Sequence, residues 1–144
     1  CEKYSVEFMS TPFDIQSASM LADIGCKAFK IASGDITNFP LLRHVAQQEL
    51  PIFLSTGASS IPEIRQAVSE IEKFTDISVC IMHCTLCYPT RARDANLSAL
   101  LHLREEFPRH ILGLSDHTIG PVIPAASALY DCKVIAKHYT ICIV

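Results

Sequence analysis

The chain repeats one pattern six times: a short apolar segment ends in polar residues and is followed by an amphipathic stretch. The apolar segments span residues 6–9, 28–32, 51–54, 79–82, 111–114 and 133–136. Most of them are continuous apolar runs, which are typical of strands covered on both faces in a parallel sheet. The amphipathic stretches predict helices, so we expect strand and helix to alternate along the chain.

Start and stop signals predict five helices between these segments. Ser60 followed by Glu63 is a capping-box pair, and apolar residues at helical spacing follow it, which predicts a helix over residues 61–73. Asn38 and Asn96 can cap two further helices. The remaining helices are expected over residues 15–24 and 122–129.

The alternation of strand and helix requires parallel strands with right-handed crossovers, which leaves an open doubly wound sheet or a barrel. In an open sheet the ligand binds at one switch point, so only some strand ends need functional side chains. Here every apolar segment ends in polar residues, as expected when all strand ends meet at the mouth of a TIM barrel. No glycine-rich dinucleotide or Walker-type loop follows any segment. The sequence therefore predicts an α/β fold of the TIM (β/α)8 barrel type.

A complete barrel has eight strands in typically ~250 residues, whereas this chain offers six units in 144 residues. We therefore expect an incomplete barrel of about six β/α units. Residue 1 is Cys rather than Met, and the last residues stop within an apolar run, so both ends are expected to be cut from a longer chain. No linker divides the chain, and one partial barrel domain is expected over residues 1–144.

Composition excludes several classes of function. With 12 Lys and Arg against 15 Asp and Glu, the net charge is −3, which leaves no basic surplus for nucleic-acid binding. No apolar run approaches the ~18 to 20 residues that span a bilayer, so no membrane association is expected. Seven cysteines, an odd number, lie mostly in apolar stretches and indicate reduced thiols in a cytoplasmic protein rather than a disulfide framework.

Lys30 lies between Phe29 and Ile31 in a segment expected to be buried. A buried ammonium is costly unless an anion neutralises it. With Ser33 just beyond it, Lys30 indicates a phosphate or carboxylate site; the alternative is a structural ion pair with a carboxylate such as Asp35. Hydroxyls at other strand ends could add donors to the site: Thr11, Ser55 and Ser115.

Two histidines, His117 and His138, follow the last two apolar segments and are expected to face one mouth. With Asp116 nearby they could hold a divalent metal and leave positions open for water and substrate. The alternative is a hydrogen-bonded structural role or an acid–base role for each. Three histidines are expected at the surface, His44, His102 and His110, and the position of His83 leaves its role open. Cys84 and Cys87 lack a second pair and are expected to be small buried thiols.

The strand-end motifs, read in order, resemble those of the sialic acid synthases and their relatives that make legionaminic and other nonulosonic acids. The motifs are FMSTPFD (8–14), FKIASGDITNFPLL (29–42), PIFLSTGAS (51–59), MHCTLCYPT (82–90), DANL (94–97), GLSDHTIG (113–120) and KVIAKHYT (133–140). The combination of KIASGD with SDHT is highly specific, and the resemblance covers nearly the whole chain. It implies that the chain holds the third to eighth strands of the barrel, without the first two strands and the C-terminal antifreeze-like domain of the family.

The resemblance implies condensation of phosphoenolpyruvate with an N-acetylated hexosamine, typically N-acetylmannosamine, with release of phosphate. His117 and His138 would bind the divalent metal, usually Mn²⁺, and His138 would thereby take part in catalysis. Tyr88 and Asp35 would face the sugar, with Asp35 also a candidate proton shuttle. The phosphoenolpyruvate would be held by Lys30, Ser33, Thr11, Ser55 and Ser115. A homodimer is implied for the full-length parent.

Three positions depart from the family pattern. Ala136 stands where the family has Glu, Leu86 replaces a small polar residue, and Tyr130-Asp131 replace the common Gly-Ala. Two alternatives therefore stay open beside the synthase: a non-catalytic phosphosugar-binding relative of the barrel, and another phosphoenolpyruvate-dependent aldol-type synthase.

Overall fold

The computed structural model describes residues 1–141, which form a parallel sheet of five strands whose order in space follows the chain, β1-β2-β3-β4-β5. The strands are β1 (Phe29–Ile31), β2 (Ile52–Ser55), β3 (Val79–Cys84), β4 (Ile111–Asp116) and β5 (Val134–Lys137). The helices are α1 (Ile15–Asp23), α2 (Phe39–Ala46), α3 (Ile61–Glu72), α4 (Ala99–Glu106) and α5 (Val122–Ser127). Short 3₁₀ turns span Glu2–Tyr4, Ser33–Asp35, Ala92–Asp94 and Ala128–Tyr130.

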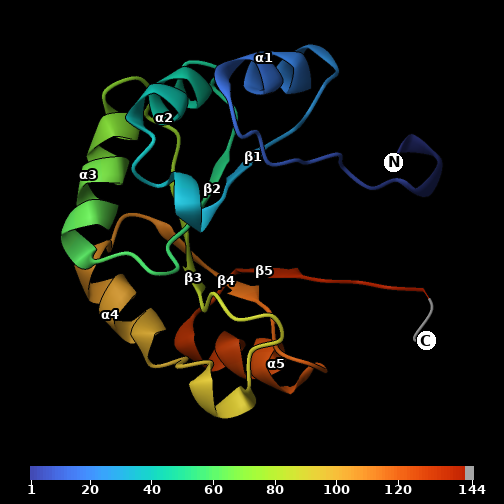
Figure 1. The fold of residues 1–144 in the computed structure, drawn as a ribbon, viewed down its shortest axis with the longest axis vertical. Helices are drawn as coiled ribbons and strands as arrows, with labels where there is room; N and C mark the ends of the chain where they lie inside the picture. The colour runs from blue at the N-terminus through green and yellow to red at the C-terminus, as the bar shows by residue number, and fades with distance from the viewer. Residues whose placement is uncertain (142–144) are drawn as a thin grey trace.

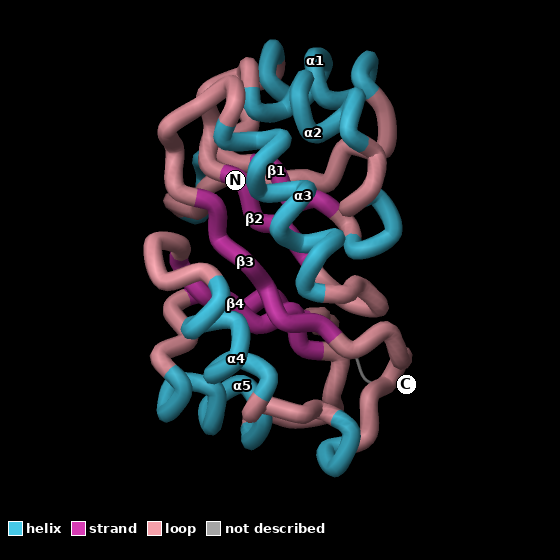
Figure 2. Tube along the Cα trace, turned by 90° about the vertical axis from the view of Figure 1, so that its left-hand side faces the viewer, coloured by secondary structure: helices cyan, strands magenta, loops and turns pink. Residues whose placement is uncertain are grey.

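The sheet is curled, and the five helices form an arc along its convex face (Figures 1 and 2). Each strand pairs with the next strand in the chain, and a helix lies in each crossover. An open doubly wound sheet would instead reverse its strand order at a switch point. The prediction of an incomplete TIM barrel is confirmed, and the concave face of the sheet is the inside of that barrel.

The first expected strand, residues 6–9, does not form a regular strand. The segment runs beside β1, where Ser10 and Phe29 form an isolated parallel bridge and the Lys30 N–H donates to the Ser10 carbonyl at 3.0 Å. No strand among residues 1–141 pairs with its outer edge, and most of its side chains are exposed. The segment therefore has neither the second neighbour nor the cover that its apolar sequence requires.

The helix ends follow the capping signals in most places. The Ser60 N–H donates to the Glu63 carboxylate at 2.8 Å, and α3 ends one residue before its predicted end. The Asn38 side chain accepts from the Leu41 N–H at 3.4 Å at the start of α2. The prediction that Asn96 caps a helix is wrong: it adopts a left-handed φ of 46° in a turn, and α4 begins only at Ala99.

The hydrophobic core lies between the sheet and the helices. Alternate strand residues point to opposite faces, and those facing the helices are buried in one cluster: Phe29, Ile31, Ile52, Leu54, Val79, Ile81 and Leu112. The residues between them face the concave side, among them Lys30, Ser55 and Ser115. On β3 the residues that face the concave side are Cys80, Met82 and Cys84. Because such strands are apolar on both faces, their sequences form continuous apolar runs.

Two further predictions concern membranes and thiols. Within residues 1–141, no helix combines the length and the apolar character needed to cross a bilayer. The six cysteines of this part of the chain are all free, as expected of reduced thiols. The seventh, Cys142, lies outside the described residues.

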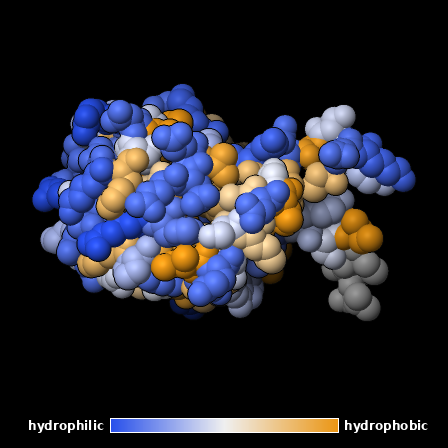
Figure 3. Space-filling view, turned by 90° about the horizontal axis from the view of Figure 1, so that it is seen from above, coloured by the Kyte–Doolittle hydropathy of each residue, from blue (hydrophilic) through white to orange (hydrophobic). Residues whose placement is uncertain are grey.

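Seen from above, apolar residues gather where the terminal segments leave the body of the molecule (Figure 3).

The core predicts a large stability difference between two aliphatic truncations. Ile81 is fully buried in β3, whereas Leu101 on α4 is 52% exposed. Ile81→Ala should lower the free energy of unfolding by ~2–5 kcal/mol because it leaves a cavity, and Leu101→Ala should change it by less than ~0.5 kcal/mol. Urea denaturation measures both. Equal losses for the two variants would contradict the placement of the core.

Candidate active site

The carboxyl ends of the strands converge on the concave face, as one contact demonstrates. The Lys30 ammonium on β1 donates to the Ser115 hydroxyl on β4 at 3.2 Å, with β2 and β3 lying between the two strands. No ion pair joins Lys30 to Asp35 or to another carboxylate within residues 1–141. The lysine is half-buried, and its ammonium contacts a hydroxyl rather than a carboxylate, an arrangement suited to an anion.

The other predicted hydroxyls lie at the same end of the sheet. Ser33 accepts from the Gly57 N–H at 2.9 Å, which ties the loop after β1 to the loop after β2. The Ser55 hydroxyl is buried and has no hydrogen-bond partner among the described residues. A buried polar group without a partner is costly, so Ser55 offers a donor to a bound ligand. Thr11 is half-buried, just past the bridge to β1.

Asp35 is the candidate proton shuttle, and it lies in the 3₁₀ turn after β1. Its carboxylate is half-buried and accepts from the Asn38 side-chain amide at 3.4 Å. Asn38 also caps α2. One amide therefore holds both the start of that helix and the orientation of the Asp35 carboxylate.

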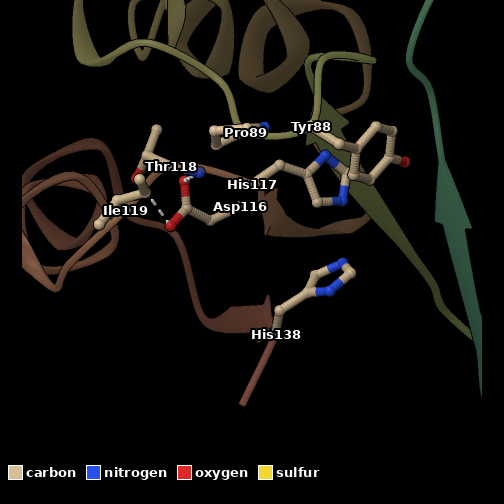
Figure 4. Close-up of a pocket in the computed structure, with 7 residues that line it drawn as sticks. All are labelled: Tyr88, Pro89, Asp116, His117, Thr118, Ile119 and His138. Atoms are coloured by element: carbon tan, nitrogen blue, oxygen red, sulfur yellow. Dashed lines mark hydrogen bonds between the residues drawn. The ribbon is translucent and has the colours of Figure 1, made fainter. Parts of the chain in front are cut away.

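His117 and His138 face each other from the ends of β4 and β5 (Figure 4). Their rings lie edge to face with centroids 5.4 Å apart. The His117 Nδ1 lies 3.0 Å from the Thr85 carbonyl oxygen. A carbonyl can only accept, so Nδ1 carries a proton; in the neutral ring Nε2 then keeps its lone pair, which is the arrangement that orients histidine ligands in metal sites.

Asp116 does not join these histidines. Its carboxylate is buried and accepts from the Thr118 N–H at 3.1 Å and from the Lys137 ammonium. Within the described part of the chain, no group of three or more His, Cys, Asp and Glu side chains could hold a metal ion. Ala136 lies opposite Ser115 in the β4–β5 ladder and brings no carboxylate to the mouth. The two imidazoles fit a divalent first-row ion as a partial ligand set, with the other positions left to water and substrate.

An aromatic pocket adjoins the histidines. It measures about 250 Å³ and is lined by Tyr88, Pro89, Asp116, His117, Thr118, Ile119 and His138 (Figure 4). The ring centroid of Tyr88 lies 4.1 Å from that of His117. Partial burial, with a smaller effect from the Cys84 thiol, raises the pKa of the Tyr88 phenol. The phenol therefore stays protonated at neutral pH and can donate a hydrogen bond.

Leu86 places an apolar side chain beside Ser33 and Gly57 at the mouth. Its Cγ and Cδ2 atoms would lie 2.8 and 3.0 Å from a Cβ built on Gly57, and the Ser33 hydroxyl would lie 3.0 Å from the same point. Leu86 is 48% exposed, so part of it covers Gly57 and part faces solvent. Any side chain at position 57 would have to displace Leu86.

The remaining histidines correct part of the surface prediction. His102 is exposed as expected. His44 is half-buried, with its Nε2 2.9 Å from the Ser19 hydroxyl. Only 9% of the His110 side chain is exposed, and burial lowers its pKa. His83 is structural, with its Nε2 2.8 Å from the Ala95 carbonyl. His44, His83 and His110 thus have local contacts that the sequence pattern did not indicate.

Two functional contributors were missed by the sequence reasoning. The Thr85 carbonyl sets the tautomer of His117, and a backbone group leaves no signal in a side-chain pattern. Lys137 pairs with Asp116, and its place directly before His138 was a signal that could have been used. Of the residues that the sequence singled out, Cys84 is buried as expected, whereas Cys87 is exposed.

The fold and its mouth define a segment of an α/β barrel with polar side chains gathered at the carboxyl ends of its strands. A family model described as the NeuB family matches residues 1–142, and the chain belongs to this family. The resemblance seen in the sequence motifs is thereby confirmed. Members of the family are synthases of sialic and related nonulosonic acids.

Individual relatives agree with this placement. An N,N'-diacetyllegionaminic acid synthase of Legionella pneumophila is 40% identical over 139 residues, which cover 94% of this chain and 39% of that protein. The crystal structure of the spore coat polysaccharide biosynthesis protein spsE of Bacillus subtilis matches with a TM-score of 0.95 and 37% identity, over 98% of this chain and 40% of that one.

A sialic acid synthetase of Leptospira borgpetersenii, solved in complex with citrate, matches with a TM-score of 0.92 and 38% identity. That match covers 97% of this chain and 48% of the Leptospira chain. The chain thus spans less than half the length of each of these three relatives.

Thiol chemistry gives a direct test of the concave face. Cys80 is buried beside Gly113, and burial, with a smaller effect from Cys132, raises the pKa of its thiol to about 12. Because the thiolate is the nucleophile, iodoacetamide at pH 8 should label the exposed Cys1 and Cys87 and leave Cys80 unmodified in the native chain. Peptide mass spectrometry measures the sites. Labelling of Cys80 as fast as Cys87 would contradict its burial.

Proposed function

We propose that this chain is the substrate-binding part of a synthase that condenses phosphoenolpyruvate with N-acetylmannosamine or a related N-acetylated sugar to give a nonulosonic acid and phosphate. The observation that carries the proposal is the Lys30–Ser115 contact of 3.2 Å across the mouth. It gathers a cation and hydroxyls at the end of the sheet that also carries the two histidines. The proposal refers to the full-length protein.

Phosphoenolpyruvate carries two anionic groups, and the mouth offers them one ammonium and several hydroxyls. Lys30 would form a charge-assisted contact with one of these groups. Ser55, whose buried hydroxyl has no partner among the described residues, would donate to the other. Ser33, Thr11 and Ser115 complete the proposed donor set. Together they would orient the enol carbon toward the second substrate, which lowers the entropic part of the barrier.

His117 and His138 would hold the divalent ion, proposed as Mn²⁺, which supplies a Lewis acid for the aldehyde oxygen of the sugar. The Thr85 carbonyl keeps the Nε2 lone pair of His117 available. Tyr88 would present its aromatic face to the sugar and donate from its phenol to a sugar oxygen. His138 would act in catalysis by holding the reacting aldehyde in line with the enol carbon.

The condensation forms a carbon–carbon bond between the enol carbon of phosphoenolpyruvate and the aldehyde carbon, and the aldehyde oxygen takes up a proton to become a hydroxyl. Water adds to the phosphate-bearing carbon and loses a proton; the carbon–oxygen bond to phosphate in the resulting tetrahedral intermediate then breaks while the new hydroxyl gives up its proton, which leaves the ketone and free phosphate. Asp35, held by Asn38, would move one of these protons. Lys30 would balance the charge of the departing phosphate.

A non-catalytic phosphosugar-binding protein is the second candidate, because Ala136 and Leu86 remove polar groups from the mouth. A different phosphoenolpyruvate-dependent aldol-type synthase is the third. Phosphate release from phosphoenolpyruvate, measured with Mn²⁺ and a panel of aldehyde acceptors, separates the three. Release only with N-acetylated hexosamines supports the proposal, release only with other aldehydes supports the third candidate, and binding without release supports the second.

Replacing Lys30 tests the anion site in the full-length protein. Lys30→Ala should raise the KM for phosphoenolpyruvate roughly tenfold to a hundredfold, because a charge-assisted contact contributes ~1.5–3 kcal/mol. The KM for the sugar should change little. Lys27→Ala is the matched control, since this exposed lysine lies just before the same strand. Steady-state kinetics that show an unchanged phosphoenolpyruvate constant would remove Lys30 from the site.

Replacing the histidines tests the metal site. His117→Ala and His138→Ala should each abolish Mn²⁺-dependent turnover and weaken Mn²⁺ binding, with little change in Tm because neither ring lies in the core. The exposed His102→Ala is the control. Ala136→Glu should tighten Mn²⁺ binding by adding a carboxylate beside Ser115. Calorimetric Mn²⁺ titration measures all four, and unaltered affinity in both site variants would exclude the two-histidine site.

A further inference from the structure

We propose that the ion pair between Asp116 and Lys137 is a positioning device that sets the separation of His117 and His138. Asp116 directly precedes His117, and Lys137 directly precedes His138. A side-chain link between Asp116 and Lys137 therefore fixes the distance between the backbone positions from which His117 and His138 extend. The proposal deepens the proposed function and rests on its two-histidine metal site.

The backbone alone does not hold the histidines together. Asp116 and Lys137 are the last paired residues of the β4–β5 ladder, so both histidines lie beyond the final rung. No strand among residues 1–141 pairs with the outer edge of β5, and His138 is exposed. The side-chain contacts that join the two strands next to the rings are those of the Lys137 ammonium with the Asp116 carboxylate and the Thr118 carbonyl.

The pair is built as a fixed point rather than as a loose surface contact. The Asp116 side chain is 2% exposed, and that of Lys137 is 28% exposed. The Lys137 ammonium also donates to the Thr118 carbonyl at 2.6 Å, while the Thr118 hydroxyl donates to Asp116 at 3.0 Å. Three residues around His117 and His138 thus close a small network in which both charges are satisfied.

Such a network contributes more to geometry than to stability. Removing only one partner of a buried ion pair is destabilising, but replacing both partners with neutral groups is often tolerated. The metal site, by contrast, has only two imidazoles, because Ala136 supplies no carboxylate. With so few ligands, the affinity depends on how well the two rings are held before the ion arrives. Loss of the ion pair should therefore affect metal binding more than folding.

The first experiment titrates the full-length protein with Mn²⁺ and follows the free ion by electron paramagnetic resonance. Lys137→Met should weaken binding at least tenfold, and Lys137→Arg should restore most of the affinity because it can still pair with Asp116. Lys133→Met is the matched control: Lys133 pairs with Asp131 at the other end of β5, away from the histidines. Wild-type affinity in Lys137→Met would overturn the proposal.

A second measurement needs no metal and separates this inference from the proposed function. Nuclear Overhauser contacts between the two imidazole rings should be present in wild type and Lys133→Met and absent in Lys137→Met. If wild type binds no Mn²⁺, the metal role fails and the ring contacts still decide on the positioning role. Retained ring contacts in Lys137→Met would overturn it.

The double variant Asp116→Asn/Lys137→Met covers the case in which Lys137→Met does not fold, because it leaves no unpaired charge. It should keep the Tm within a few degrees of wild type while losing the ring contacts. Ring contacts that persist in the folded double variant would count against the ion pair as the positioning element.

Discussion

Parallel pairing in chain order is the constraint on which the rest of the structure depends. A parallel strand can follow another only after a crossover, so each helix returns the chain to the same end of the sheet. All carboxyl ends therefore point one way, and the curl of the sheet turns them toward each other. Lys30 on β1 can reach Ser115 on β4 only because of this curl. The helices on the convex side supply the burial that keeps the sheet curled.

The mouth is built from groups that a stable core would avoid. Among the described residues, the half-buried Lys30 ammonium has no carboxylate partner and the buried Ser55 hydroxyl has no hydrogen-bond partner, and both carry a cost in free energy. By contrast, the helix-facing residues of β1 and β2 are apolar and buried: Phe29, Ile31, Ile52 and Leu54. The helix-facing side of the sheet thus stabilises the fold, whereas the concave side offers polar atoms to a ligand. The apolar Leu86 lies at this mouth beside Gly57 and Ser33.

Much of the fold could be predicted because it depends on local patterns. Apolar runs marked β1 to β5, and Ser60 with Glu63 marked α3, since both signals act within a few residues. Residues 6–9 have the same apolar pattern but no second strand beside them among residues 1–141, and sequence does not report pairing. In the site, Lys30 and the two histidines were found by their chemistry. The direction of the Asp116 side chain was not, because it depends on Lys137 from another strand.

The close packing of Leu86 against Gly57 has an evolutionary consequence. A Cβ at position 57 would lie 2.8 Å from the Leu86 Cγ, so a larger residue at position 57 requires Leu86 to move or to become smaller. A smaller residue at position 86 meets no such barrier. The effect of a substitution at position 57 therefore depends on which residue occupies position 86, which makes mutations in the two loops epistatic.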